Sequence, residues 1–296
     1  MLIRWIALLG LFAISAGAWA ISPYVQGDPV SGASVQAVAS AVEGKLKSGG
    51  FKVVGRYFPR GLPDRGVLIA TDDAMLDEVG SVGGHAVLGA AIRVGVRADG
   101  SVTYSNPDYW YRAYFRKDFE RKEAAVKALQ ARLQAALGAG KGVGGSEEAA
   151  NLTNYRYMIG MERLDSYKNK LASYDSFNDA LKAVRDNLAR GAAGTARVYE
   201  IVLPSRKLAV FGVAMQDDAD WIRKIEQQEH IAALPYEIYI LDKDVNAPHG
   251  RFRIALAFPD VGMGQFMRIS SLPNNILNTL GAVAGVDRAS TQEAWQ

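Results

Sequence analysis

Two segments with the same pattern of apolar residues, Ser34–Gly50 (SVQAVASAVEGKLKSGG) and Asp175–Gly191 (DSFNDALKAVRDNLARG), decide the fold of this chain. In both, apolar residues recur every three or four positions, which predicts an amphipathic helix that ends at glycine. Each position of the first stripe has a counterpart 142 residues later: Val35/Phe177, Val38/Ala180, Ala39/Leu181, Val42/Val184, Leu46/Leu188 and Gly49/Gly191. This agreement in register indicates an internal repeat.

The repeat continues downstream as strands, predicted from β-branched and aromatic runs. The expected strands are Phe51–Phe58, Val67–Ala70, Ala90–Val96 and Val102–Ser105 in the first half, and Ala196–Leu203, Leu208–Val213, Tyr236–Leu241 and Phe252–Phe258 in the second. Two extra strands, Tyr155–Leu164 and Tyr167–Tyr174, are expected to open the second half. The fold class is therefore α+β, with two similar domains packed as a pseudo-dimer. Each domain is expected to be a mainly antiparallel sheet with helices on one face.

Composition shifts give the domain boundaries. We expect the first repeat at 31–137, a Gly-rich flexible linker at 138–149, the second repeat at 150–285 and a tail at 286–296. The linker contains GAGKGVGGS at Gly138–Ser146. It follows a long predicted helix, Phe115–Leu137, and a mostly apolar run at Leu272–Val283 is expected to dock on the core or a partner.

The first twenty-one residues predict export. Arg4 precedes a charge-free run, Trp5–Ile21, and Ala18-Trp19-Ala20 has the pattern of a cleavage site. Residues 1–21 are thus either a signal peptide or an N-terminal membrane anchor, because a charge-free, mostly apolar run of seventeen residues lies near the lower limit for spanning a bilayer. The expected location is the periplasm, with the protein either soluble after cleavage or tethered to the inner membrane by residues 5–21.

Composition excludes several classes of function. The 296 residues include no Cys, which removes disulfides, thiolate catalysis and Cys-ligated metals. A net charge of +3 is too small to indicate a nucleic-acid partner. The glycines of Gly140–Gly145 follow a helix rather than a strand, so they are not a dinucleotide fingerprint. We predict no cofactor, no resident metal and no catalytic residue.

Two groups of residues are candidates for a binding site. His85 and His230 are offset by 145 residues, so each half places one imidazole before its third strand. Structural packing is the simpler interpretation, but the two rings could also converge on a ligand or metal. The second group is an aromatic cluster that includes Tyr104, Asn106, Tyr109 and Trp110. Such a cluster packs the edge of a core or lines an exposed groove or partner contact.

The chain resembles the family called domain of unknown function 302, in a helix ending at Gly, a Leu-Pro before a hydrophobic strand, and a strand running into Asn-Pro-x-Tyr. The matching segments are Val38–Phe58, Val102–Tyr109, Phe177–Leu203 and Leu234–Leu241. The first half has Gly89-Ala90 in place of Leu-Pro, and the second has Phe258-Pro259-Asp260 in place of Asn-Pro-x-Tyr. The resemblance implies two divergent copies of a compact α+β domain that often pairs with another copy, and it implies no particular activity.

The sequence therefore predicts an exported, non-enzymatic protein that binds a small ligand or serves as an accessory subunit of a bacterial envelope complex. The alternative is a periplasmic enzyme or metal-binding protein that uses His85 and His230.

Export is directly testable. A reporter enzyme that is active only in the periplasm, fused after residue 30, should be active because the run after Arg4 is apolar enough to engage the export machinery. Activity of a matched cytoplasmic reporter at the same junction would instead overturn the predicted location.

Overall fold

A computed structural model describes residues 19–286 of the chain. Of the predicted signal peptide or anchor at 1–21, only Trp19, Ala20 and Ile21 are described. The rest of that segment, and the tail apart from Val286, lie outside the described residues. Within residues 19–286, no helix combines the length and the apolar character needed to cross a membrane.

The first half is built on a six-stranded antiparallel sheet with the order β3–β4–β5–β6–β2–β7. The strands are β2 (Tyr24–Gln26), β3 (Lys52–Tyr57), β4 (Arg65–Thr71), β5 (Ile92–Arg97), β6 (Val102–Ser105) and β7 (Gly142–Val143). Helix α1 (Val35–Ser48) packs on this sheet with its predicted apolar stripe buried. It begins at Ser34, whose hydroxyl accepts a hydrogen bond from the Ala37 N–H, as an N-cap should.

The second half is built on a five-stranded antiparallel sheet with the order β10–β11–β12–β13–β9. Its strands are β9 (Lys170–Ser173), β10 (Ala196–Leu203), β11 (Leu208–Ala214), β12 (Tyr236–Leu241) and β13 (Asp244–Asn246). Helix α6 (Phe177–Ala189) begins at Ser176, which caps the Asp179 N–H. The strand order of this sheet matches the order β3–β4–β5–β6–β2 of the first sheet, and α6 is capped by a serine as α1 is. The α+β fold class is confirmed.

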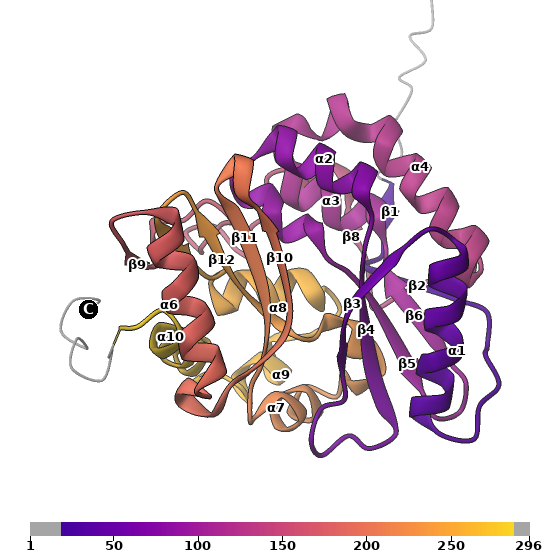
Figure 1. Cartoon of the computed structure of the whole chain (residues 1–296). Helices are drawn as coiled ribbons and strands as arrows, with labels where there is room; N and C mark the ends of the chain where they lie inside the picture. The colour runs from indigo at the N-terminus through magenta and orange to yellow at the C-terminus, as the bar shows by residue number, and fades with distance from the viewer. Residues whose placement is uncertain (1–18, 287–296) are drawn as a thin grey trace, which may run out of the picture.

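Short helices fill the connections (Figure 1). In chain order they are α2 (Asp73–Val82), α3 (Pro107–Phe115), α4 (Phe119–Leu137), α5 (Ala149–Leu152), α7 (Asp218–Lys224), α8 (Gly250–Ala257), α9 (Met263–Met267) and α10 (Leu272–Val283). The 3₁₀ segments are η1 (Gly84–Ala90), η2 (Arg116–Asp118), η3 (Tyr167–Asn169), η4 (Ala192–Gly194), η5 (Pro204–Arg206) and η6 (Gln228–Ala233). A separate two-stranded ribbon pairs β1 (Ala20–Ile21) with β8 (Glu147–Glu148).

The two sheets meet at their edge strands, β3 and β10, which lie side by side in the centre of the molecule (Figure 1). Each edge strand carries an irregularity at the same place, between Val53 and Gly55 in β3 and between Arg197 and Tyr199 in β10. A Cβ atom added at Gly55 would lie only 2.6 Å from the Val198 carbonyl oxygen. Gly55 therefore allows the two edges to approach this closely.

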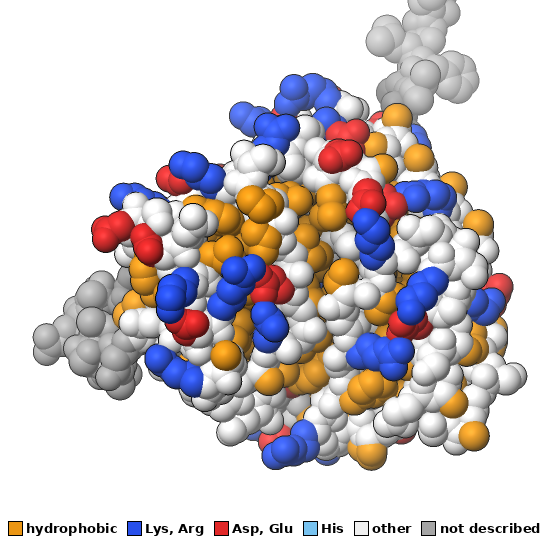
Figure 2. Space-filling model, in the orientation of Figure 1, with side chains coloured by type: hydrophobic (Ala, Val, Ile, Leu, Met, Phe, Trp, Pro, Cys, Tyr) orange, Lys and Arg blue, Asp and Glu red, His pale blue; other side chains and the backbone are white. Residues whose placement is uncertain are grey.

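Strand β10 also contributes apolar side chains to the outer surface. Figure 2 shows hydrophobic side chains gathered over β10 and β11 on the face in view, with charged side chains around them. Val198, Val202 and Leu203 are half-buried there and pack against the core. Glu200 on the same strand pairs with Arg185 and Arg197, so much of the neighbouring charge is neutralised.

The predicted strand Phe252–Phe258 is wrong, because these residues form helix α8. The short strand β13 completes the hairpin instead, and the chain then turns at His249, whose ring Nδ1 accepts from the Arg251 N–H. Because the run is buried on nearly all sides, its residues do not alternate, and a buried strand cannot be told from a buried helix by periodicity.

Three other segments differ from expectation. Residues 155–164 form turns without a strand, and only Lys170–Ser173 of the expected second strand pairs in the sheet. The Gly-rich segment expected to be a flexible linker contributes β7, which pairs with β2. The long helix predicted from Phe115 begins at Phe119, because Arg116 adopts a φ of 54° and interrupts it.

A substitution at Gly55 tests the close approach of the two sheets. Gly55→Ala should lower the free energy of unfolding by about 1–3 kcal/mol, because the new methyl group would overlap the β10 backbone. Gly44→Ala is the matched control: its position in α1 is open, so it should raise stability by about 0.5–1 kcal/mol. Equal effects in urea unfolding would contradict the observed packing.

Candidate functional site

A pocket of about 560 Å³ lies beside His85 and is the candidate site. Its walls come from residues 82–86, residues 114–118, and Thr153, Asn154 and Asp165. The first two segments belong to the first half, whereas the last three residues open the second. This volume falls within the range of small-molecule sites. We call it the His85 pocket.

The second half holds the imidazole of His85 in place. Its Nδ1 lies 2.9 Å from the Tyr239 hydroxyl oxygen on β12, and the two rings meet edge to face at 5.7 Å. Burial lowers the pKa of His85, and this effect outweighs the opposing field of Asp165. The ring is therefore neutral at pH 7 and acts as a hydrogen-bonding group rather than a cation.

The rim of the His85 pocket is charged. Arg116 pairs with Asp165 at 2.6 Å, and Asp118 pairs with Arg121. Burial raises the pKa of Asp165, but the hydrogen bond and charge of Arg116 outweigh it and keep this carboxyl ionised. Lys117 is exposed and has no ion-pair partner among the described residues. It is the cation most available to a ligand.

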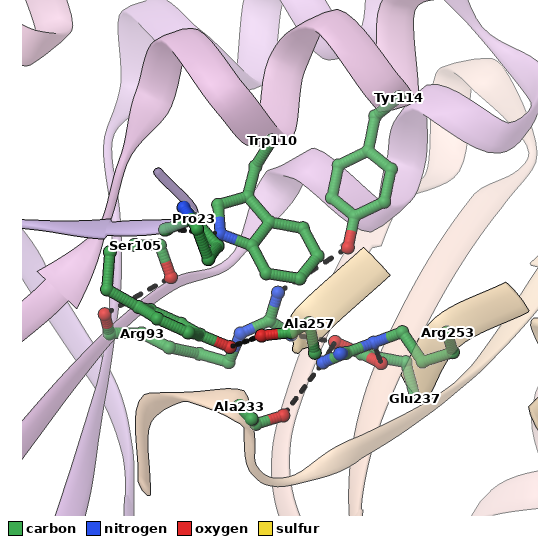
Figure 3. A network of polar contacts seen from close by, with 10 residues as sticks. Pro23, Arg93, Ser105, Trp110, Tyr114, Ala233, Glu237, Arg253 and Ala257 are labelled. Carbon is green, nitrogen blue, oxygen red and sulfur yellow. Dashed lines mark hydrogen bonds and ion pairs between the residues drawn. The ribbon is translucent and has the colours of Figure 1, made fainter. Parts of the chain in front are cut away.

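A buried ion network joins the two halves (Figure 3). The Glu237 carboxylate on β12 receives hydrogen bonds from Arg93 on β5 and from Arg253 on α8. All three side chains are at most 3% exposed. Arg253 also donates to the Ala233 carbonyl at 2.8 Å. Two guanidinium groups thus share one carboxylate in the interior, an arrangement that is stable only while all partners are in place.

Trp110, one of the predicted site residues, belongs to this network. Arg93 and Arg253 each lie 5.1 Å from the centre of its indole ring, which offers a negative face to both cations. The indole Nε1–H donates to the Pro23 carbonyl at 2.8 Å and so holds the ring in position. Trp110 therefore offsets the extra positive charge of the network.

The other members of the aromatic cluster are also buried. Tyr109 donates from its hydroxyl to the Leu256 carbonyl in the second half, and Tyr104 donates to the Gly138 carbonyl, both at 2.8 Å. Asn106 begins α3 and donates through Nδ2 to the Ser22 carbonyl at 2.8 Å. The expectation of an exposed aromatic groove is corrected, because the cluster is needed to fill the core and the contact between the halves.

His230 lies in a different environment from His85. Its ring stacks on Tyr24 with the centroids 5.5 Å apart, and burial lowers its pKa. No described contact joins the two imidazoles. Over residues 19–286, no group of three or more His, Asp or Glu side chains is placed to hold a metal ion. Of the two histidines, only His85 lines the pocket.

Sequence reasoning did not single out most of the pocket's polar residues. Thr153 and Asn154 lie between the expected linker and the expected strand Tyr155–Leu164, and Asp165 lies between the two expected strands. Lys117 lies in the expected helix Phe115–Leu137. No local motif marks them. A signal did exist for the ion network: Arg93 and Glu237 are charged residues within apolar strands, 144 positions apart.

Comparison of the chain with protein-family models, curated proteins and solved structures finds no match. The resemblance to the domain of unknown function 302 therefore stays a prediction.

The buried network predicts a large effect from a small change. Glu237→Gln should lower the free energy of unfolding by about 3–5 kcal/mol, because it leaves two buried guanidinium groups without a counter-charge. Asp186→Asn removes the carboxylate of an exposed pair with Lys182 and should change stability by less than about 1 kcal/mol. Similar losses for both variants in urea unfolding would show that the network does not stabilise the fold.

Proposed function

We propose that this chain is an exported, non-enzymatic ligand-binding protein of the bacterial envelope, whose two repeats pack as a pseudo-dimer. The observation that carries the proposal is the His85 pocket, which takes residues from both halves and is large enough for a small molecule. The halves hold the pocket's central imidazole between them through the contact of His85 with Tyr239.

Equivalent residues in contact support the pseudo-dimer. Arg93 and Glu237 are the second residues of the matching strands β5 and β12, and they pair with each other. Trp110 and Arg253 are the fourth residues of α3 and α8, and they too are in contact. Equivalent positions meet in this way across a twofold axis. The repeats would have descended from two copies that once paired as a symmetric dimer.

A binding role fits the chemistry of the pocket better than catalysis. In the described part of the chain, the hydrogen-bond partner of His85 is a buried tyrosine rather than a carboxylate or a nucleophile. A general base needs a reacting partner within hydrogen-bond reach. The alternative, a metal site or enzyme built on His85 and His230, draws no support from two rings with separate partners.

The envelope location rests on residues 1–21. Trp19 is 68% exposed where the chain leaves the described fold, and Ile21 is buried in the ribbon with β8. A membrane anchor within the expected segment 5–21, ending before the ribbon that begins at Ala20, would therefore hold the folded part close to the inner membrane. An accessory role in an envelope complex would place the ligand near a protein partner there.

A thermal-shift screen of the full-length protein tests the proposal. The panel would hold amino acids, dicarboxylates, sugar phosphates and neutral sugars. At least one compound should raise the melting temperature, since a ligand at a hundred times its Kd adds about 2.7 kcal/mol to stability.

Thr153→Trp, which fills the pocket, should abolish that shift. The matched control Ala128→Trp, on an exposed position of α4, should retain it. A panel without any stabilising compound, or a shift that survives in Thr153→Trp, would contradict a binding role for the pocket.

A further inference from the structure

The buried amide of Asn169 lies beside Tyr239, the tyrosine that contacts His85. Its Oδ1 accepts from the His249 backbone N–H at 3.0 Å, and its Nδ2 donates to the Leu164 carbonyl at 2.6 Å. Backbone N–H groups only donate and carbonyls only accept, so these two contacts fix which end of the amide is oxygen. Asn169 is 1% exposed, which leaves water little access to it.

Tyr239 is the residue that holds His85. Burial raises the pKa of Tyr239, and the neighbouring Asn169 amide opposes this rise. The Tyr239 side chain is fully buried. Among the described groups, its own hydroxyl proton has one acceptor, Nδ1 of His85. Tyr239 therefore donates to His85.

The tautomer of His85 follows. An Nδ1 that accepts a hydrogen bond carries no proton, so the neutral ring carries its proton on Nε2. The opposite tautomer would leave the Tyr239 O–H without an acceptor in the interior, which is unfavourable. No described group bonds Nε2, and His85 lines the pocket. The ring thus offers the pocket a fixed N–H donor.

Resting on the proposed function, we infer that the His85 pocket binds the oxyanion group of its ligand, a carboxylate or a phosphate, between the Nε2–H of His85 and the ammonium of Lys117. The charged residues that line the pocket are Arg116, Lys117, Asp118 and Asp165. Asp118 pairs with Arg121, and Asp165 pairs with Arg116 and Arg163. Because the carboxylates already pair with arginines, the charge of Lys117 is left for the ligand. The N–H of the neutral imidazole fixes the orientation of the bound oxyanion, and the ammonium of Lys117 attracts its negative charge.

Nitrogen-15 NMR of the full-length protein in detergent reads the tautomer without any ligand. Only three histidines contribute signals. At pH 7, His85 should show a protonated Nε2 and an unprotonated Nδ1. Tyr239→Phe should remove this preference, whereas Tyr167→Phe, at an exposed tyrosine outside the pocket, should preserve it. A wild-type ring protonated on Nδ1 would overturn the inference.

Titration with acetate, inorganic phosphate and glycerol tests the ligand chemistry and distinguishes the two oxyanions. One or both anions should shift the Nε2 resonance, and glycerol should not. Lys117→Ala should weaken the anion's apparent affinity about tenfold, the effect of losing one charge-assisted hydrogen bond. Lys127→Ala, at an exposed lysine paired with Glu123 on α4, is the matched control and should change it little.

The two proposals fail in different ways. A neutral or cationic compound that binds the pocket, or anion binding that is unchanged in Lys117→Ala, would overturn the oxyanion site and leave a ligand-binding pocket. A correct tautomer in a protein whose pocket binds no compound of the screen and none of these three probes would overturn the binding role itself.

Discussion

The carboxylate of Glu237, buried between Arg93 and Arg253, is the constraint on which the rest of the structure depends. A charge can remain in the interior only if its partners are there too, and here one partner comes from the other half of the chain. If the halves separated, Arg93 would lose the carboxylate of Glu237. The indole of Trp110 lies against both guanidinium groups, and its contact with Arg253 is a second interaction between the halves. The two sheets are therefore expected to form one cooperative unit rather than two independent domains.

The contacts across this junction also shape the candidate site. Segment η1 of the first half packs on β11 and β12, while η6 of the second half packs on β4, β5 and β6. Each half thus places its 3₁₀ segment on the sheet of the other. On one side this exchange brings His85 to Tyr239 beside the pocket, whereas on the other it stacks the half-buried His230 on Tyr24. The two matching segments therefore place their histidines in different environments.

The sequence predicts the repeat and most of the strands because helical stripes and β-branched runs are local patterns, as at Val35–Leu46 and Ala196–Leu203. It fails at Phe252–Phe258, where burial on all sides removes the periodicity that distinguishes a helix from a strand. For the candidate site, sequence offset singles out His85, which lines the pocket, but it treats His230 as equivalent. It cannot find Lys117, Thr153 and Asn154, because their proximity arises from a helix break at Arg116 and from packing between distant segments. The sequence leaves open whether the aromatic cluster around Trp110 packs the core or lines an exposed groove, and the structure shows that its side chains are buried.

Native-state hydrogen exchange of the full-length protein tests the central claim that the buried network makes the two halves one unit. The amides of β4 and β5 report on the first sheet, and those of β11 and β12 on the second. The account predicts that the slowest amides in both sheets open with the same free energy, because Arg93 and Glu237 cannot be separated without exposing both cores. Exchange of one sheet through a lower-energy opening, while the other stays protected, would contradict it.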